Sequence, residues 1–306
     1  MVYNTFVKKE RFMRETKLLN TKLKTILAVL IIYVICFAFR ALEYFVIRTD
    51  RTFFGEAFIH KLIGIGIMIA AVFIFHYRFE DIGFKTGKSF FDILKGLIFG
   101  IAVFTVAYGT EIIILAASNN LQAVEFYVTA YSVDAGTEVK RTGIFFLVCA
   151  IGNVINVLME EGVFRGLFQK MLSDKYKWLI AGIIASLLFG LWHIMAPLRS
   201  LIEGNKTVGG FIGESAMLIG TSALVGFKFV LMGKITGNLY MGMGDHFVNN
   251  TIVNILHVIN KENEADQLQV IRISIAQSVS FIAVLIWFFI DKKLKAKAAT
   301  QQEAAI

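Results

Sequence analysis

Three polar clusters interrupt the apolar stretches in the second half of this sequence, and their side chains are of the kinds that activate water. A carboxylate or an imidazole can take a proton from water as a general base. An imidazole N–H or a side-chain amide can stabilise the oxyanion that forms when water attacks a carbonyl. Residues of these types are suited to the hydrolysis of a peptide bond. The clusters contain Glu160, Glu161 and Arg165, then Phe189 and His193, and finally His246 and Asn250.

Helical spacing separates the roles of the two adjacent glutamates. Glu161 and Arg165 are four residues apart, so on a helix their side chains lie on one face and can form an ion pair. Glu160 is turned by about 100° from Glu161 on the same helix, so that arginine need not neutralise it. We therefore predict that Glu160 is the general base and that the pair of Glu161 and Arg165 supports the site.

Each of the other two clusters combines a histidine with a residue one helical turn away. Phe189 precedes His193 by four residues, and Asn250 follows His246 by four residues. We expect Phe189 to pack below His193, which would share the water with Glu160 or carry its proton. Asn250 is expected to orient His246 or to stabilise charge beside it, so that the two form the oxyanion side of the site.

The same residues also suit a metal ion. Two histidines and a glutamate can bind a catalytic zinc ion and leave one position open. Glu160, His193 and His246 would be the ligands if zinc is bound. The sequence does not choose between metal-free and zinc-assisted activation of water, and it indicates no other cofactor.

The composition places these clusters in a membrane. Of 306 residues, 57% are hydrophobic and 18% are charged. Soluble domains are about 45–50% apolar and about 25% charged, so a water-soluble globule of this length could not bury so much apolar material. This excludes an ordinary cytosolic enzyme and a disordered chain. A nucleic-acid-binding module is excluded despite the net charge of +8, because the basic residues lie between apolar runs.

Eight apolar runs are long enough to cross the hydrocarbon core, which needs about 20 residues per helix. Lipid offers the backbone no hydrogen bonds, so these runs are predicted to be helices. The predicted fold class is an all-α, polytopic membrane protein. The spans are Thr25–Ile47, Ala57–His76, Ile93–Ala117, Thr142–Phe164, Trp178–Ala196, Phe211–Met232, Ile235–Ile259 and Val270–Ile290.

The lysines and arginines outside these runs indicate the orientation. When the connections are assigned alternately to two sides, the side with both termini holds 19 Lys and Arg residues and the other side holds 7. Basic residues are enriched on the cytoplasmic side, so both termini are predicted to be cytoplasmic in a plasma-membrane protein. The predicted parts are a basic N-terminal segment (1–24), one membrane domain (25–290) with a catalytic core at about 142–260, and a basic tail (291–306).

Ionisable side chains elsewhere in the spans need partners, because they are costly at membrane depth. Arg40 and Glu43 are three residues apart in the first span and are predicted to pair. Glu111 in the third span is expected to pair with a residue from elsewhere. Cys36 and Cys149 lie within apolar runs, so neither a disulfide framework nor a Cys-x-x-Cys zinc site is predicted.

The three clusters together resemble the motifs of the CPBP family, which are EExxxR, FxxxH and HxxxN in this order on successive late spans. The resemblance covers about residues 142–260, and a loop at Phe79–Phe84 is similar to one common in these proteins. The family includes the Ras-converting type of CAAX prenyl protease and the bacteriocin-processing Abi proteins. The resemblance therefore implies an intramembrane endopeptidase that uses either zinc or a metal-free glutamate. The matching segments are Glu160-Glu161-Gly-Val-Phe-Arg165, Phe189-Gly-Leu-Trp-His193 and His246-Phe-Val-Asn-Asn250.

Three other functions compete with this interpretation. Gly242–Asp245 reads GxGD, as in presenilin-like aspartyl proteases, but these need a second membrane aspartate to share a proton, and the other aspartates lie in loops, tails or span ends. A proton-coupled transporter would also use Glu, Arg and His in the membrane, but it is expected to show broken helices and paired halves, and the sequence indicates neither. A catalytically silent scaffold or regulator would keep Glu160, His193 and His246 as a buried hydrogen-bond network. For an enzyme, a small peptide or a membrane protein is the favoured substrate, and prenylated, leader, pheromone and bacteriocin-related peptides are all open.

Overall fold

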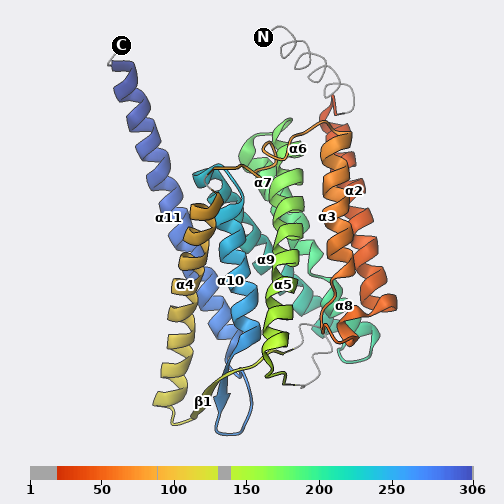
Figure 1. Ribbon diagram of the computed structural model, residues 1–306, viewed down its shortest axis with the longest axis vertical. Coiled ribbons are helices and arrows are strands. Elements are labelled where there is room, and N and C mark those ends of the chain that lie inside the picture. Colours follow the sequence, from red (N-terminus) through yellow and green to blue (C-terminus); the bar gives the residue numbers. More distant parts are fainter. Residues whose placement is uncertain (1–18, 88, 130–138, 305–306) are drawn as a thin grey trace.

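The computed structural model describes residues 19–87, 89–129 and 139–304, and this part is a helical bundle with one two-stranded sheet (Figure 1). Six of its helical stretches are long and apolar enough to cross a membrane, which confirms the predicted all-α, polytopic membrane fold. They are α2 (Lys22–Leu42) with the π-helix η1 (Glu43–Ile47), α4 (Ser89–Ala117), α5 (Gly143–Glu160) continued by the π-helix η3 (Glu161–Phe168) and α6 (Gln169–Ser173), α7 (Trp178–Trp192) followed by α8 (Met195–Ile202), α9 (Val208–Thr236) and α11 (Gln269–Ala304).

Two further helices are shorter. Helices α3 (Ile59–Ile74) and α10 (Tyr240–Ile255) have 16 residues each, which gives a length of about 24 Å against a hydrocarbon core of about 30 Å. Helix α3 packs against α2 and α5, and α10 packs against α4, α5 and α9. Each of the eight predicted runs therefore contains a helix, and the number of helices that cross a membrane stays a prediction.

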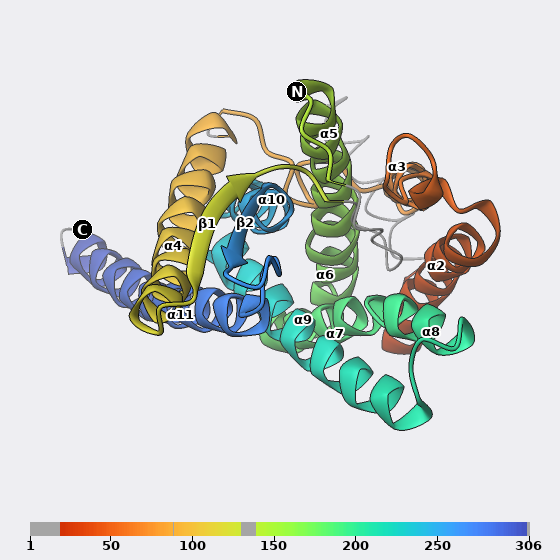
Figure 2. The ribbon, with the colours of Figure 1, turned by 90° about the horizontal axis from the view of Figure 1, so that it is seen from below.

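The start of α2 and the end of α11 lie at the same end of the bundle, which we call the termini face (Figure 1). The other end, which we call the opposite face, carries α8, the short 3-10 helix η2 (Thr49–Arg51) and the strands β1 (Leu121–Phe126) and β2 (Leu256–Asn260) (Figure 2). An even number of crossings would give this arrangement. Most of the predicted basic N-terminal segment, residues 1–18, lies outside the described residues, as do residues 305–306 of the tail.

A helix break next to His193 corrects the predicted span Trp178–Ala196. Helix α7 ends at Trp192, and α8 begins at Met195. In a continuing helix, a proline ring clashes with the carbonyl group of the residue four positions earlier, and the residue four positions before Pro197 is His193. Pro197 itself lies in the first turn of α8, where its missing N–H is not needed. The only proline of the sequence thus explains why His193 lies at a helix end.

The predicted span Ile235–Ile259 is wrong at both ends. Helix α9 continues past Ile235 and ends at Thr236. The next residue, Gly237, has a φ of 76°, the left-handed conformation that commonly follows a helix. After α10, residues Leu256–Asn260 form β2, which pairs with β1 in antiparallel fashion. The partner strand lies in the polar connection after α4, so hydropathy within the seventh run could not reveal this pairing.

Two glycines bring the backbones of α4 and α10 into contact. A Cβ atom on Gly96 would lie 2.1 Å from the carbonyl oxygen of Met241, and a Cβ atom on Gly244 would lie 2.4 Å from that of Ile93. Small residues allow helices in membranes to approach this closely. The contact fixes the position of α10 against α4, and α10 carries His246.

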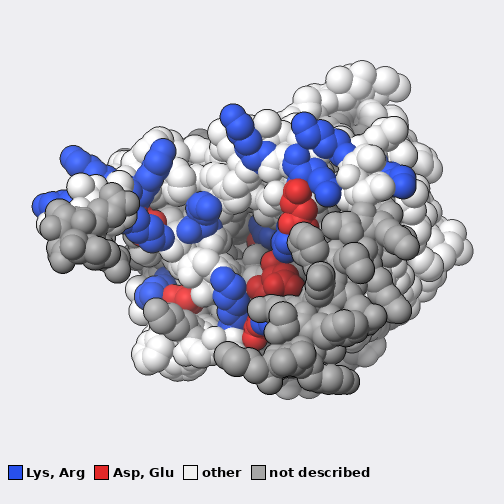
Figure 3. Space-filling view, turned by 90° about the horizontal axis from the view of Figure 1, so that it is seen from above, with Lys and Arg blue, Asp and Glu red and all other residues white. Residues whose placement is uncertain are grey.

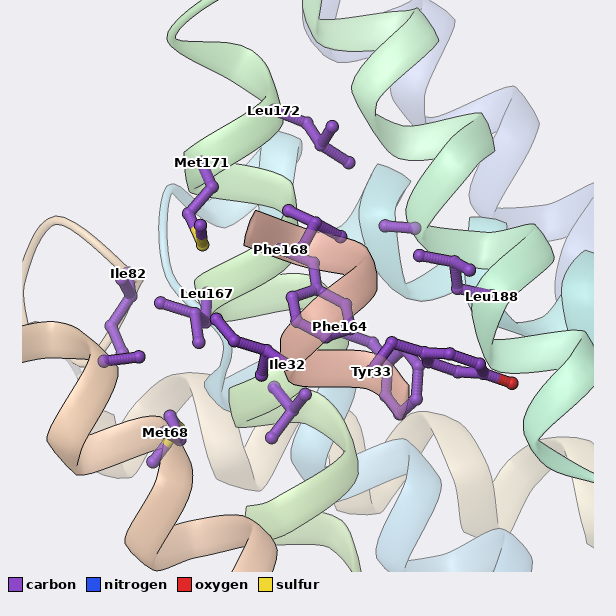
Figure 4. Packing of buried hydrophobic residues seen from close by; sticks show 14 of the residues in the cluster. Ile32, Tyr33, Met68, Ile82, Phe164, Leu167, Phe168, Met171, Leu172 and Leu188 are labelled. Atoms are coloured by element: carbon purple, nitrogen blue, oxygen red, sulfur yellow. The ribbon is translucent and has the colours of Figure 1, made fainter. Parts of the chain in front are cut away.

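The largest apolar core holds η3 between α2, α3 and α7 (Figure 4). Phe164 and Phe168 of η3 are buried among Ile32 and Tyr33 of α2 and Leu188 of α7. Between helices in a membrane, such packing stabilises mainly through van der Waals contact. The core therefore anchors the two elements that hold Glu161 and His193.

Candidate active site

The two adjacent glutamates lie where α5 changes into a π-helix. Helix α5 ends at Glu160, and η3 begins at Glu161. Both side chains are buried, with relative exposures of 4% and 1%. The predicted ion pair is present, because Nε of Arg165 lies 3.2 Å from Oε2 of Glu161. Short π-helical segments often occur at functional sites, and this one lies directly beside the predicted general base.

Glu160 accepts hydrogen bonds from two side chains. Nε1 of Trp192 donates to Oε1 at 3.1 Å, and Nδ2 of Asn156 donates to Oε2 at 3.2 Å. The guanidinium group of Arg40 lies 3.9 Å from Oε1. Its carbon atom is 4.5 Å from the centroid of the Trp192 ring. These contacts hold the carboxylate in one position with a positive charge nearby.

His246 connects the two glutamates. Its Nδ1 lies 2.8 Å from Oε1 of Glu161, and its Nε2 lies 3.5 Å from Oε2 of Glu160. An ionised carboxylate only accepts hydrogen bonds, so beside an ionised Glu161 the Nδ1–H group of His246 is the donor of this hydrogen bond. The ring of Phe229 stacks on the imidazole at a centroid distance of 5.0 Å. Glu161 thus contacts both Arg165 and His246 and ties η3 to α10.

His193 is oriented by a backbone carbonyl. Its Nδ1 donates to the carbonyl oxygen of Phe189 at 2.9 Å. In a neutral imidazole this leaves a lone pair on Nε2. The Phe189 ring packs against His193 as expected, with 4.8 Å between centroids, and its centroid lies 3.8 Å from the guanidinium carbon of Arg165. His193 therefore offers an acceptor, whereas a doubly protonated His246 would offer a donor.

A cavity of about 250 Å³ brings the predicted chemical groups together. Glu160, His193, His246 and Asn250 all contribute to its lining. The side-chain oxygen of Asn250 accepts a hydrogen bond from Asn249 at 3.1 Å. The lining also includes residues that lie toward the opposite face, namely Asp50, Glu56, Ala57, Lys61, Ala196 and Arg199. Glu161, Arg165 and Phe189 do not line the cavity. Glu161 and Phe189 contact the lining residues His246 and His193, and Arg165 contacts Glu161 and Phe189.

The predicted pair of Arg40 and Glu43 is wrong. Arg40 faces Glu160 and Trp192 instead. Glu43 begins the π-helix η1, and its carboxylate accepts the backbone N–H groups of Ile59 and His60 at the start of α3. Those N–H groups have no partner within α3, so a carboxylate there is favourable. The contact joins residues 16 and 17 positions apart, which helical spacing cannot predict.

Three neighbours of Glu160 were also missed by sequence reasoning. Asn156 precedes Glu160 by one helical turn, so the spacing applied to the other clusters would have found it. Trp192 is adjacent to His193, but its contact with Glu160 joins two helices. Arg40 could have been suspected only as an ionisable residue at membrane depth.

The donor types of the predicted metal ligands suit zinc, but their arrangement does not. Within residues 19–87, 89–129 and 139–304, no group of three or more His, Cys, Asp or Glu side chains is placed to hold a metal ion. Glu160, His193 and His246 share a cavity without converging on one coordination point. The mechanism proposed below therefore uses side chains and water.

One comparison with known proteins finds a family that part of the chain resembles. Residues 142–252 match the family described as type II CAAX prenyl endopeptidase Rce1-like, and the matched segment contains all three motifs. No curated protein matches the chain. The resemblance to the CAAX prenyl proteases is confirmed. The prediction that Glu111 pairs with a residue from elsewhere is also confirmed, because Arg272 donates to its carboxylate at 2.6 Å. Residues 142–252 of this multi-pass membrane protein are thus similar to the Rce1-like family of type II CAAX prenyl endopeptidases.

Proposed function

We propose that the protein is an intramembrane endopeptidase in which Glu160 and His193 activate the water that hydrolyses a peptide bond. One observation carries this proposal: Glu160, His193 and His246 line a single cavity, and His246 lies 3.5 Å from Glu160. The family match supports the class of reaction. Buried ionisable side chains at membrane depth also need a functional explanation.

The attack step uses the carboxylate and the acceptor nitrogen of His193. Water donates one hydrogen bond to Glu160 and another to Nε2 of His193. Glu160 takes a proton as the water oxygen attacks the carbonyl carbon of the substrate. The hydrogen bonds from Trp192 and Asn156 keep the carboxylate oriented for this transfer.

The opposite side of the carbonyl is assigned to His246 and Asn250. Protonated His246 points Nε2–H at the developing oxyanion while Glu161 holds its Nδ1–H. The amide of Asn250 donates a second hydrogen bond. One oxyanion donor commonly contributes about 10²–10³ in rate. Collapse of the tetrahedral intermediate breaks the C–N bond, and Glu160 returns its proton to the leaving amine.

The proposed substrate is a small peptide or a membrane-protein segment in the plasma membrane. The cavity includes residues near the opposite face, which the charge pattern predicts to lie outside the cytoplasm. A peptide would therefore approach the active site from the face that does not carry the termini.

The test is cleavage of a peptide library by purified protein in detergent, with products identified by mass spectrometry. The wild type is expected to cleave, and Glu160→Gln is expected to lose about 10²–10⁴ in rate, because the amide cannot take a proton. Glu125→Gln is the matched control, since Glu125 is a half-buried carboxylate on β1 that pairs with Arg141 and does not line the cavity. Equal cleavage by wild type and Glu160→Gln would contradict the proposal, and a wild type that cleaves nothing would favour the silent scaffold.

A chelator arm tests the role of zinc. The side-chain mechanism predicts that chelation leaves the rate unchanged. A rate that is lost with chelator and recovered with zinc would assign Glu160, His193 and His246 to metal binding instead.

A further inference from the structure

A second cavity, which we call the inner cavity, opens on the termini face. Its volume is about 200 Å³, enough for roughly six water molecules at about 30 Å³ each. It shares no lining residue with the active-site cavity. Figure 3 shows this face, where Lys and Arg side chains are spread over the visible surface. The inner cavity is formed by η3, α6, the start of α7, the end of α9 and the loops before α4 and α10, and the proposed hydrolysis does not use it.

The lining of the inner cavity includes a buried arginine with unused donors. Arg165 is 5% exposed, and none of its three guanidinium nitrogens makes a hydrogen bond to a described residue. Its charge is paired with Glu161, and its guanidinium carbon lies 3.8 Å from the ring centroid of Phe189 and 5.2 Å from that of Phe229. Buried donors are almost always satisfied in folded proteins. A hydrogen-bond acceptor bound in the inner cavity would satisfy the unused N–H donors of Arg165.

Two lysines at the rim carry positive charge that the described residues do not pair. The ammonium group of Lys234 lies 5.3 Å from the centroid of Trp178, another lining residue. The ammonium of Lys85 lies 3.7 Å from the position that a Cβ atom on Gly237 would take. Neither forms an ion pair with the part of the chain that the structure describes. One carboxylate, that of Asp81, also lines the inner cavity and opposes an anion there.

We propose that the inner cavity binds one phosphate group, either from a phospholipid headgroup or from free phosphate. The planar guanidinium of Arg165 presents several N–H donors, which match phosphate oxygens in geometry and charge. Glu161 already balances the charge of Arg165. Lys234 supplies a further positive charge that can balance the bound phosphate. The termini face is the predicted cytoplasmic face, where anionic lipids provide phosphate groups at the membrane surface.

The test is a calorimetric titration of purified protein with inorganic phosphate at constant ionic strength. Lys234→Gln removes a cation and is expected to weaken binding by about tenfold. Asp81→Asn removes the opposing charge and is expected to strengthen binding by a few fold, while the amide oxygen keeps the turn contact with the backbone N–H of Arg78. Lys177→Gln is the control, because Lys177 is exposed near this face and does not line the inner cavity.

A second arm separates the two sources of phosphate. The titration is repeated in a maltoside detergent, which carries no phosphate, with and without a water-soluble phosphatidylglycerol. Weaker binding of phosphate in the presence of phosphatidylglycerol assigns the inner cavity to a lipid headgroup, and unchanged binding assigns it to free phosphate. The proposal is overturned if the wild type binds no phosphate, or if wild type, Lys234→Gln and Asp81→Asn all bind it equally. Peptide cleavage is not part of this readout, so its outcome does not depend on the proposed hydrolysis.

Discussion

Glu160 and Glu161 are adjacent in the sequence but have different partners. Glu160 faces the cavity and is held by Trp192 and Asn156. Glu161 lies behind it and contacts both Arg165 and His246. This difference suits two roles. Glu160 can exchange a proton with water, whereas Glu161 orients His246 and balances the charge of Arg165.

Trp192→Phe tests the first of these roles. Phenylalanine removes the indole donor to Glu160 but keeps an aromatic face for Arg40. The kcat of peptide cleavage is expected to fall by about tenfold, because a hydrogen bond to a charged group contributes about 1.5 kcal/mol. The KM is expected to change little. Steady-state kinetics of the purified variant gives both values.

The matched control for this substitution is Trp287→Phe, on the exposed surface of α11. It is expected to keep the wild-type kcat. A Trp192→Phe protein with wild-type kcat would show that the indole contact has no part in catalysis.

Contacts within one helix could be predicted from the sequence, whereas contacts between helices could not. The pairs of Glu161 with Arg165 and of Phe189 with His193 follow from a spacing of four residues. The contact of Glu161 with His246 joins residues 85 positions apart. No single-sequence spacing rule contains that information, which is supplied by the packing of α10 on α4 and α5.

At the scale of elements, the site lies at irregular parts of the helices. The π-helix η3 begins at Glu161, and the break between α7 and α8 lies at His193. The break follows from Pro197 alone and was within reach of sequence reasoning. The π-helix was not predicted, and the structure shows it packed against α2, α3 and α7.

Gly96→Ala tests how α4 positions α10. The new methyl group would overlap the carbonyl oxygen of Met241, so the substitution is expected to destabilise the protein by about 1–3 kcal/mol. Cleavage activity is also expected to fall, because a shift of α10 moves His246. Thermal denaturation in detergent and the peptide assay measure the two effects.

Gly109→Ala, in the same helix, is the control. No atom lies within 4 Å of its added methyl group, so this variant is expected to be neutral or more stable by up to about 1 kcal/mol. If Gly96→Ala and Gly109→Ala had the same melting temperature and activity, the close helix contact would not matter for the site.

At the scale of the whole molecule, a polar chain links two separate cavities. Glu160 lines the active-site cavity and Arg165 lines the inner cavity, with His246 and Glu161 between them. Hydropathy predicted the membrane bundle, because lipid demands long apolar helices. It did not predict the two-stranded sheet of β1 and β2, whose strands are stabilised by each other rather than by lipid.

The orientation predicts which residues an impermeant maleimide can reach in intact cells. Asn205→Cys lies in the loop before α9, toward the opposite face, and is expected to be labelled. Lys297→Cys lies near the end of α11 and is expected to be labelled only after lysis. The native Cys36 and Cys149 are free but buried, so background labelling of these two residues is expected to be low. The reverse labelling pattern would contradict the predicted orientation.

Single-turnover cleavage in oxygen-18 water tests most directly whether the side chains around Glu160 deliver water to the peptide bond. The measurement is the mass of the new carboxyl group in the first product released by excess wild-type enzyme. The proposed mechanism predicts one oxygen-18 atom in that group, and no product from Glu160→Gln on the same timescale. An unlabelled first product would contradict the mechanism, because the new oxygen would then come from an enzyme side chain through a covalent intermediate.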